Sequence, residues 1–240
     1  MSRRALSVAE ILPRGWEDVF SPAHPRIGVG YDIATTTKKK SNPSALAVVQ
    51  QVGPSYFARL VLRWKTKDPD VARAILRKVI TSLPHGLRAR RLCVDATNER
   101  YFATDVRSEF AAIVPVELVV SSEGKTHRGE DMIMKTFLGN QLVETINDGY
   151  LPLPEADWLK RDIRQVVIDR GAFVAEVDEY GNHGDCFDAI KLALHALIAG
   201  GGPADARAAA TGTLGKSRGE RPGIKNPLTR RKGASHRLSA

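Results

Sequence analysis

Hydrophobic residues recur with two different periods along the chain, and the change of period divides it into strands and helices. From Ile27 to Tyr31 every second residue is hydrophobic, within a strand predicted at 26–36. The stretches 44–53 and 55–65 are rich in β-branched and aromatic residues, and a Gly-Pro pair separates them. Strands joined by short connections pair in an antiparallel manner. The three strands are therefore expected to form an antiparallel meander.

From residue 68 onward the spacing becomes helical, with short apolar runs between the helices. Helices are predicted at 68–83, 99–111, 130–148, 155–170 and 183–198, strands at 92–95 and 114–122, and a sixth strand or hairpin arm at 172–179. The continuous apolar run that ends at Asp95 is typical of a buried parallel strand. A meander followed by alternating helices and parallel strands predicts an α/β fold, with helices on the faces of a mixed sheet. This is also the order of elements in the RNase H-like fold.

The length and the composition are those of one sizeable globular domain. Hydrophobic residues make up 42% and charged residues 26% of the chain. We expect an N-terminal arm or linker at 1–25, a core domain at 26–200 and a basic tail at 201–240. No apolar run approaches the roughly 20 residues that span a membrane, and the basic N-terminus has no apolar core of the kind that signal peptides contain.

The positive charge is concentrated near the C-terminus. The net charge is +9, and residues 203–240 contain nine Lys or Arg against Asp205 and Glu220, so the rest of the chain carries only +2. A basic segment that is rich in Gly, Ala and Pro and has no hydrophobic period is expected to be disordered. Two roles remain open for it: a tether for nucleic acid or a partner, and a solvated extension without a role.

Cysteine usage indicates an intracellular protein. Cys93 and Cys186 both lie inside apolar patterns, and buried free thiols in a reducing cytoplasm are their expected state. The sequence contains neither a CxxC pair nor a local Cys/His cluster, so residue spacing predicts no zinc site.

Three aspartates at the ends of predicted elements carry the candidate chemistry. Asp32 lies in the first strand, Asp95 ends the strand at 92–95, and Asp185 opens the last helix. A buried carboxylate is unfavourable unless a positive charge pairs with it, so three of them in such places suggest a shared cation. Mg²⁺ prefers oxygen ligands, and two such ions activate water and stabilise the leaving oxygen of a phosphodiester. The aspartates therefore predict a metal-dependent phosphodiesterase.

Each aspartate also has a local explanation that the sequence leaves open. The Asp32 side chain could cap the turn formed by the threonines that follow it, and Asp95 could form an Asx-turn. Asp185 could simply be favoured by the positive end of the last helix. Asp188 lies one helical turn beyond Asp185. It is a candidate for a fourth ligand, for a residue that supports the ligands, or for a solvated side chain.

Basic residues in two loops are candidates for contacts with DNA phosphates. They are Lys125, His127 and Arg128 after the strand at 114–122, and Lys38, Lys39 and Lys40 after the first strand. His183, just before Asp185, is a candidate for a contact with the scissile phosphate or for proton transfer. Ordinary exposed polar loops and a surface histidine explain the same residues equally well.

The hexapeptide GTLGKS at 212–217 looks like a phosphate-binding loop but lacks two of its features. The full pattern requires glycine where this chain has Ala210, and a strand before the loop. We therefore predict no ATP-binding site in this chain.

Four segments together resemble the C-terminal nuclease domain of bacteriophage terminase large subunits. They are GYDIA at 30–34, LCVDATN at 92–98, KTFLGNQLVETINDGYLPLP at 135–154 and HGDCFDAIKLA at 183–193. That domain is RNase H-like, and the resemblance extends over residues 26–198. It implies an endonuclease in which Asp32, Asp95 and Asp185 hold two Mg²⁺ or Mn²⁺ ions and which cuts concatemeric viral DNA during packaging.

The resemblance also implies partners and a location. The substrate would be double-stranded DNA, and the partners a packaging ATPase, a small terminase subunit and the portal of the procapsid, in the cytoplasm of a host cell that carries the phage or prophage. Terminase large subunits also contain an N-terminal ATPase domain, so we expect the ATPase in another domain or another chain.

Two other interpretations remain open on the sequence alone. One is a different RNase H-like nuclease, such as a Holliday-junction resolvase or a transposase core, which a strong preference for branched over linear DNA would favour. The other is a non-catalytic module that docks on DNA or on the portal through its basic tail, which would bind without metal-dependent cleavage.

Overall fold

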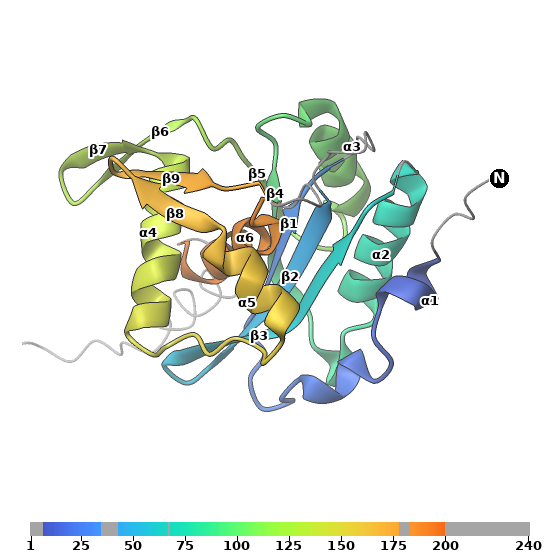
Figure 1. Ribbon diagram of the computed structural model, residues 1–240. Helices are drawn as coiled ribbons and strands as arrows, with labels where there is room; N and C mark the ends of the chain where they lie inside the picture. Colours follow the sequence, from blue (N-terminus) through green and yellow to red (C-terminus); the bar gives the residue numbers. More distant parts are fainter. Residues whose placement is uncertain (1–6, 35–42, 67, 178–182, 200–240) are drawn as a thin grey trace, which may run out of the picture. The chain divides into compact units, whose positions relative to one another are not determined.

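A five-stranded mixed sheet lies at the centre of the structure (Figure 1). The computed structural model describes residues 7–34, 43–66, 68–177 and 183–199. The strands are β1 (Ile27–Asp32), β2 (Ser44–Val52), β3 (Ser55–Trp64), β4 (Ala89–Asp95) and β5 (Val116–Val119), in the order β3-β2-β1-β4-β5. Antiparallel pairing joins β1 to β2 and β2 to β3, whereas β4 is parallel to β1 and β5 to β4. The predicted α/β fold with a mixed sheet is confirmed.

Helices cover both faces of the sheet (Figure 1). The first face carries α2 (Pro69–Thr81), α3 (Arg100–Phe110), the short α1 (Val8–Ile11) and the 3₁₀ turns η1 (Trp16–Val19) and η2 (Pro84–Gly86). The second face carries α6 (Asp185–Ile198), and α4 (Met134–Asn147) and α5 (Asp157–Arg164) pack against that helix. The sheet is thus enclosed between two helical layers, as its apolar strands require.

The segment before β1 contributes to the core of the first face. Trp16 and Phe20 are buried, and their rings meet edge to face at 6.0 Å between centroids. Both belong to the same hydrophobic cluster as Ile75 and Val79 of α2 and Val106 of α3. Part of the stretch predicted as an arm or linker therefore packs against the sheet.

α6 lies directly against the backbone of β1 because two glycines leave room for it. A Cβ atom on Gly28 would lie 2.3 Å from the carbonyl oxygen of Ala193, and one on Gly30 would lie 2.1 Å from that of Ala189. Both distances are far shorter than a van der Waals contact, so any side chain here would push the helix away from the sheet. The alternation of β1 thus puts large side chains on one face and glycines on the other.

Two β-hairpins replace parts of the predicted helices. They are formed by β6 (Gly124–His127) with β7 (Glu130–Ile133), and by β8 (Val166–Asp169) with β9 (Ala172–Ala175). The helix predicted at 130–148 therefore begins only at Met134, and the helix predicted at 155–170 ends at Arg164. The stretch at 172–179 contributes a hairpin arm.

Left-handed backbone conformations explain why the β6–β7 hairpin and the β8 arm were not predicted. The turns lie at Arg128-Gly129, with φ values of 52° and 86°, and at Arg170-Gly171, with φ values of 47° and 79°. Two central residues with positive φ match the twist of the flanking strands, and Asn-Gly or Asp-Gly is the usual sequence signal for them. Arginine in this conformation is uncommon, so neither Arg-Gly pair marked a turn in the sequence.

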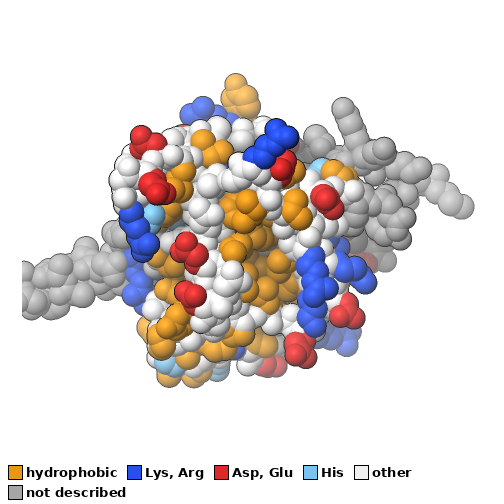
Figure 2. Space-filling model, turned by 60° about the vertical axis from the view of Figure 1, so that its left-hand side comes forward, with side chains coloured by type: hydrophobic (Ala, Val, Ile, Leu, Met, Phe, Trp, Pro, Cys, Tyr) orange, Lys and Arg blue, Asp and Glu red, His pale blue; other side chains and the backbone are white. Residues whose placement is uncertain are grey.

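The surface beside the hairpins is partly apolar. Figure 2 shows hydrophobic side chains gathered near the middle of one face, between groups of charged residues. On the β8–β9 hairpin, Val167, Ile168 and Val174 are among the exposed large hydrophobic residues.

In the part of the chain that the structure describes, no helix has both the length and the hydropathy that crossing a membrane requires.

We expect Gly30→Ala to destabilise the protein by about 2–3 kcal/mol, as overpacking of a tight core does. The added methyl group would lie 2.1 Å from the Ala189 carbonyl oxygen and 2.3 Å from the Ala193 nitrogen. Urea unfolding measures the effect. Gly124→Ala is the control, because a Cβ there meets nothing within 4 Å, and an unchanged midpoint for Gly30→Ala would show that α6 does not depend on this contact.

Candidate functional site

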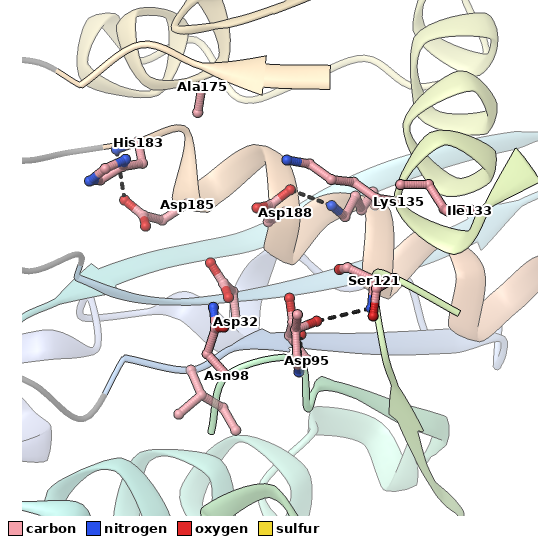
Figure 3. Close-up of a pocket in the computed structure, with 14 residues that line it drawn as sticks. Asp32, Asp95, Asn98, Ser121, Ile133, Lys135, Ala175, His183, Asp185 and Asp188 are labelled. Carbon is pink, nitrogen blue, oxygen red and sulfur yellow. Dashed lines mark hydrogen bonds and ion pairs between the residues drawn. The ribbon is translucent and has the colours of Figure 1, made fainter. Parts of the chain in front are cut away.

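Four aspartates line one cleft at the end of the sheet (Figure 3). Asp32 and Asp95 end the neighbouring parallel strands β1 and β4, one residue beyond the pair formed by Tyr31 and Val94. Asp185 and Asp188 belong to the first turn of α6, on the other side of the cleft. The cleft has a volume of about 400 Å³. The structure thus brings together four carboxylates from distant parts of the sequence.

The start of α6 is held in place by groups that the sequence analysis did not single out. Asp162 of α5 is buried and accepts hydrogen bonds from the Cys186 amide at 2.9 Å and from Arg63 Nη1 at 2.6 Å. The amide of Gly184, which has a left-handed φ of 76°, donates to Gln165 Oε1 at 3.2 Å. Asp162 therefore satisfies a free amide at the positive end of α6, and Arg63 balances its charge. Neither residue lies in a local motif.

Burial and repulsion between carboxylates raise the pKa of Asp32 and of Asp185. Burial, followed by the charges of Asp188, Asp95 and Asp185, raises the pKa of Asp32 well above its usual value, although Lys191 opposes the shift. Burial is also the main cause that raises the pKa of Asp185 to about 7, although a hydrogen bond from the His183 amide lowers it. Carboxylates in this state gain much from a cation that binds among them.

Lys191 is a buried positive charge at the edge of the carboxylate group. Its side chain is only 3% exposed, and its Nζ donates to Asp188 Oδ1. The sequence offered a weak signal for it, since Lys191 lies within two helical turns of Asp185 on the same helix. Asp188 is therefore engaged by a lysine, whereas its role as a metal ligand stays a prediction.

Asp95 makes the local contact that the sequence suggested and also lines the cleft. Its Oδ1 accepts a hydrogen bond from the Thr97 amide at 2.7 Å, which is an Asx-turn, and Thr97 Oγ1 accepts one from the Ser121 amide at 2.9 Å. This chain of contacts joins the end of β4 to the segment after β5. The local and the functional explanations of Asp95 are thus compatible, because the turn orients the carboxylate at the rim of the cleft.

The predicted phosphate-contact residues fall into three groups. His183 lines the cleft beside Asp185 (Figure 3). Lys125, His127 and Arg128 are exposed on the β6–β7 hairpin and do not line it. Lys38, Lys39 and Lys40 lie outside the described residues, as does the tail at 201–240.

The hairpin is anchored close to the cleft by an aromatic side chain of α4. Lys125 Nζ lies 5.5 Å from the centre of the Phe137 ring, and the His127 ring lies 5.0 Å from it. Lys135, two residues before Phe137, lines the cleft (Figure 3). Sequence reasoning missed Lys135 because its region was assigned to the interior of a longer helix.

The donor set of the cleft fits hard divalent cations. Asp32, Asp95, Asp185 and Asp188 offer only carboxylate oxygens, which Mg²⁺ and Mn²⁺ prefer. The raised pKa of Asp32 and Asp185 adds a second observation, because bound cations would relieve the repulsion that causes part of each shift. The arrangement suits a site for phosphate chemistry.

Comparison with known proteins identifies the fold. No protein-family model and no curated protein matches this chain. A large terminase from a thermophilic bacteriophage is 15% identical with a TM-score of 0.51, over 79% of this chain and 42% of that one. The large terminase nuclease of the thermophilic phage G20c is 13% identical with a TM-score of 0.51, over 72% of this chain and 83% of that one. The human cytomegalovirus terminase nuclease domain is 14% identical with a TM-score of 0.48, over 78% of this chain and 90% of that one.

The chain spans less than half of the first of these large terminases but most of the G20c nuclease. At these identities the comparison defines the fold, which is that of the RNase H-like nuclease domains of large terminases.

Proposed function

We propose that this protein is a metal-dependent endonuclease that cuts concatemeric viral double-stranded DNA during genome packaging. The observation that carries the proposal is the convergence of Asp32, Asp95 and Asp185 from β1, β4 and α6 in one cleft. The terminase nuclease fold supports the biological context. Fold alone does not define chemistry, so the carboxylates are the main support.

The three aspartates would hold two Mg²⁺ or Mn²⁺ ions, with Asp188 as a further candidate ligand. When bound, such ions supply an activated water and stabilise negative charge on the leaving oxygen. Asp32 faces the cleft from the end of a central strand and Asp185 from a helix whose start is fixed by Asp162. Rigid elements of this kind hold ligands in place better than loops do.

Basic side chains around the cleft would bind the DNA backbone. Lys135 and His183 line the cleft, and Lys125 and Arg128 extend the positive surface along the β6–β7 hairpin. Contacts of this type position a duplex without reading its sequence. His127, Lys38, Lys39, Lys40 and the basic tail are further candidates for contacts with DNA phosphates.

The ATP-driven part of packaging would belong to a separate domain or chain. A large terminase of similar fold from a thermophilic bacteriophage has been solved in complex with ADP, and this chain has no phosphate-binding loop that meets the full pattern. We include a packaging ATPase, a small terminase subunit and the portal of the procapsid among the proposed partners, and the host cytoplasm as the proposed location.

Asp32→Asn, Asp95→Asn and Asp185→Asn should each reduce plasmid nicking and linearisation in Mg²⁺ or Mn²⁺ by more than about 100-fold, because loss of a ligand exceeds the 10–100-fold effect of a supporting residue. Far-ultraviolet circular dichroism should remain unchanged. Asp70→Asn is the control, since Asp70 is 81% exposed on α2, on the other face of the sheet. Full activity in all three variants would exclude this site.

The choice of DNA separates the proposed nuclease from its alternatives. Wild-type protein should cut linear and plasmid duplexes at rates similar to those for a four-way junction. A strong preference for the junction would favour a resolvase. Binding without cleavage in every metal, in the presence of an added packaging ATPase, would favour a docking module.

The metal-free protein should lose stability as the pH rises, and Asp185→Asn should suppress part of this loss. The pKa of Asp185 is about 7 in the folded state against 3.8 as the ordinary value, so the folded protein binds this proton more tightly and becomes less stable between about pH 4 and pH 7. In EDTA the variant should exceed wild type in free energy of unfolding at pH 8 but not at pH 4. Equal differences at both pH values would contradict this assignment.

Removal of residues 203–240 should weaken binding to duplex DNA and flatten its dependence on salt. The segment contains nine Lys or Arg, and each lost phosphate contact reduces the salt slope by about 0.9 for duplex DNA. Fluorescence anisotropy over a range of KCl concentrations measures the slope. An unchanged slope would assign the tail no role in DNA binding.

A further inference from the structure

A second group of metal-ligand side chains lies on the same face of the sheet as the carboxylate cleft. It consists of Cys93 on β4, Glu117 on β5 and His195 on α6, and one donor atom of each lies within 4.8 Å of the other two. His195 Nε2 is 3.0 Å from Glu117 Oε1, and Cys93 Sγ is 4.0 Å from Glu117 Oε2. None of the three lines the carboxylate cleft.

We propose that Cys93, Glu117 and His195 bind one Zn²⁺ ion that ties α6 to β4 and β5. Thiolate sulfur, imidazole nitrogen and carboxylate oxygen are the three ligand types that zinc takes in proteins. Tetrahedral bonds of about 2.0–2.3 Å place ligand atoms roughly 3.3–3.8 Å apart. The separations of 3.0 Å and 4.0 Å, which involve the two different oxygens of Glu117, lie on either side of that range. All three donor atoms lie within 4.8 Å of one another, so the side chains would have to adjust around a bound ion.

The surroundings of the group are buried and largely apolar. Cys93 is fully buried and His195 is 5% exposed. Cys93 belongs to an apolar cluster with Val119, Leu138 and residues of α6, and the Phe137 ring meets the His195 ring edge to face at 6.4 Å. An apolar shell excludes water and strengthens bonds between a cation and its ligands.

One side of the group is open to an incoming ion. The Glu117 side chain is 34% exposed and lines a pocket of about 370 Å³ on the outer edge of the sheet, with Arg91, Arg107 and Pro115. Glu117 is thus the member of the group that solvent reaches, and water would supply the fourth ligand, as it does at zinc sites with three protein ligands.

Arg91 orients the carboxylate and disfavours hard cations. Its Nη1 donates to Glu117 Oε2 at 2.6 Å, and Glu117 Oε1 is the oxygen that faces His195. A hydrogen bond to the second oxygen of a ligating carboxylate is a common supporting contact at metal sites. The positive charge of Arg91 repels any incoming cation. Mg²⁺, which is held by charge alone, is affected more than a cation that also forms a bond to sulfur.

The proposed zinc would act on structure and would be independent of the proposed nuclease activity. Cys93 precedes Asp95 by two residues on β4, and His195 follows Asp188 by two helical turns on α6. An ion at this point would lock together the strand and the helix that carry the cleft carboxylates. The two sites would also differ in metal, since one offers only oxygens and the other sulfur and nitrogen.

Cobalt spectroscopy of the full chain tests the ligands directly. Metal-free protein in the Asp95→Asn background should bind one equivalent of Co²⁺ and show the near-ultraviolet absorption of a thiolate–cobalt bond. Zn²⁺ should abolish this absorption, and excess Mg²⁺ should not. Cys93→Ser should lose the absorption, whereas Cys186→Ser, which changes the other buried free cysteine, should keep it. Absence of the absorption in the parent protein, or its presence in Cys93→Ser, would overturn the proposal.

A second variant keeps the proposal testable if Cys93→Ser does not fold. Glu117 lies at the sheet edge with part of its side chain exposed, so Glu117→Gln should fold, and it should weaken Zn²⁺ binding by more than about tenfold. In the Asp95→Asn background, Zn²⁺ should raise the unfolding temperature, and it should no longer do so when Glu117→Gln is added. Stabilisation by Zn²⁺ that persists in Glu117→Gln and disappears in Asp95→Asn would place the ion in the carboxylate cleft and overturn the proposal.

Discussion

The close contact between α6 and the backbone of β1 is the constraint on which the rest of the structure depends. Gly28 and Gly30 allow the helix to lie where a Cβ atom would collide with the carbonyl oxygens of Ala193 and Ala189. This contact sets the height and the angle at which α6 crosses the sheet. The first turn of α6 consequently reaches the ends of β1 and β4, and its last turn reaches β5.

The carboxylates of the cleft lower the stability of the metal-free fold but form a site that suits a cation. The repulsion around Asp32 is a cost in the metal-free fold, and functional sites commonly retain such costs. Two part-buried ion pairs lie close to these carboxylates, and the charge of Lys191 opposes the shift at Asp32. Arg63 pairs with Asp162 beneath the start of α6, and Lys191 pairs with Asp188 at the rim. Neither pair involves Asp32 or Asp185, and both of these residues line the cleft.

Local patterns predicted the elements that have strong periodicity, and failed where the backbone takes an uncommon conformation. The meander, the strand that ends at Asp95 and the last helix follow from alternation, apolar runs and helical spacing. The β6–β7 hairpin and the β8 arm were missed because Arg128 and Arg170 adopt positive φ without the usual turn residues. The aspartates could be predicted because a carboxylate at the end of an apolar run is a conspicuous local signal.

The sequence by itself determined the strands, the main helices and the three aspartates at their ends, because these depend on interactions between residues that are close along the chain. Only the tertiary structure decided which distant side chains meet. Arg63 and Asp162 are 99 positions apart, and Cys93, Glu117 and His195 are separated by 24 and 78 positions. No period or motif records such separations, since they arise from the order of the strands and from the path of α6 across them.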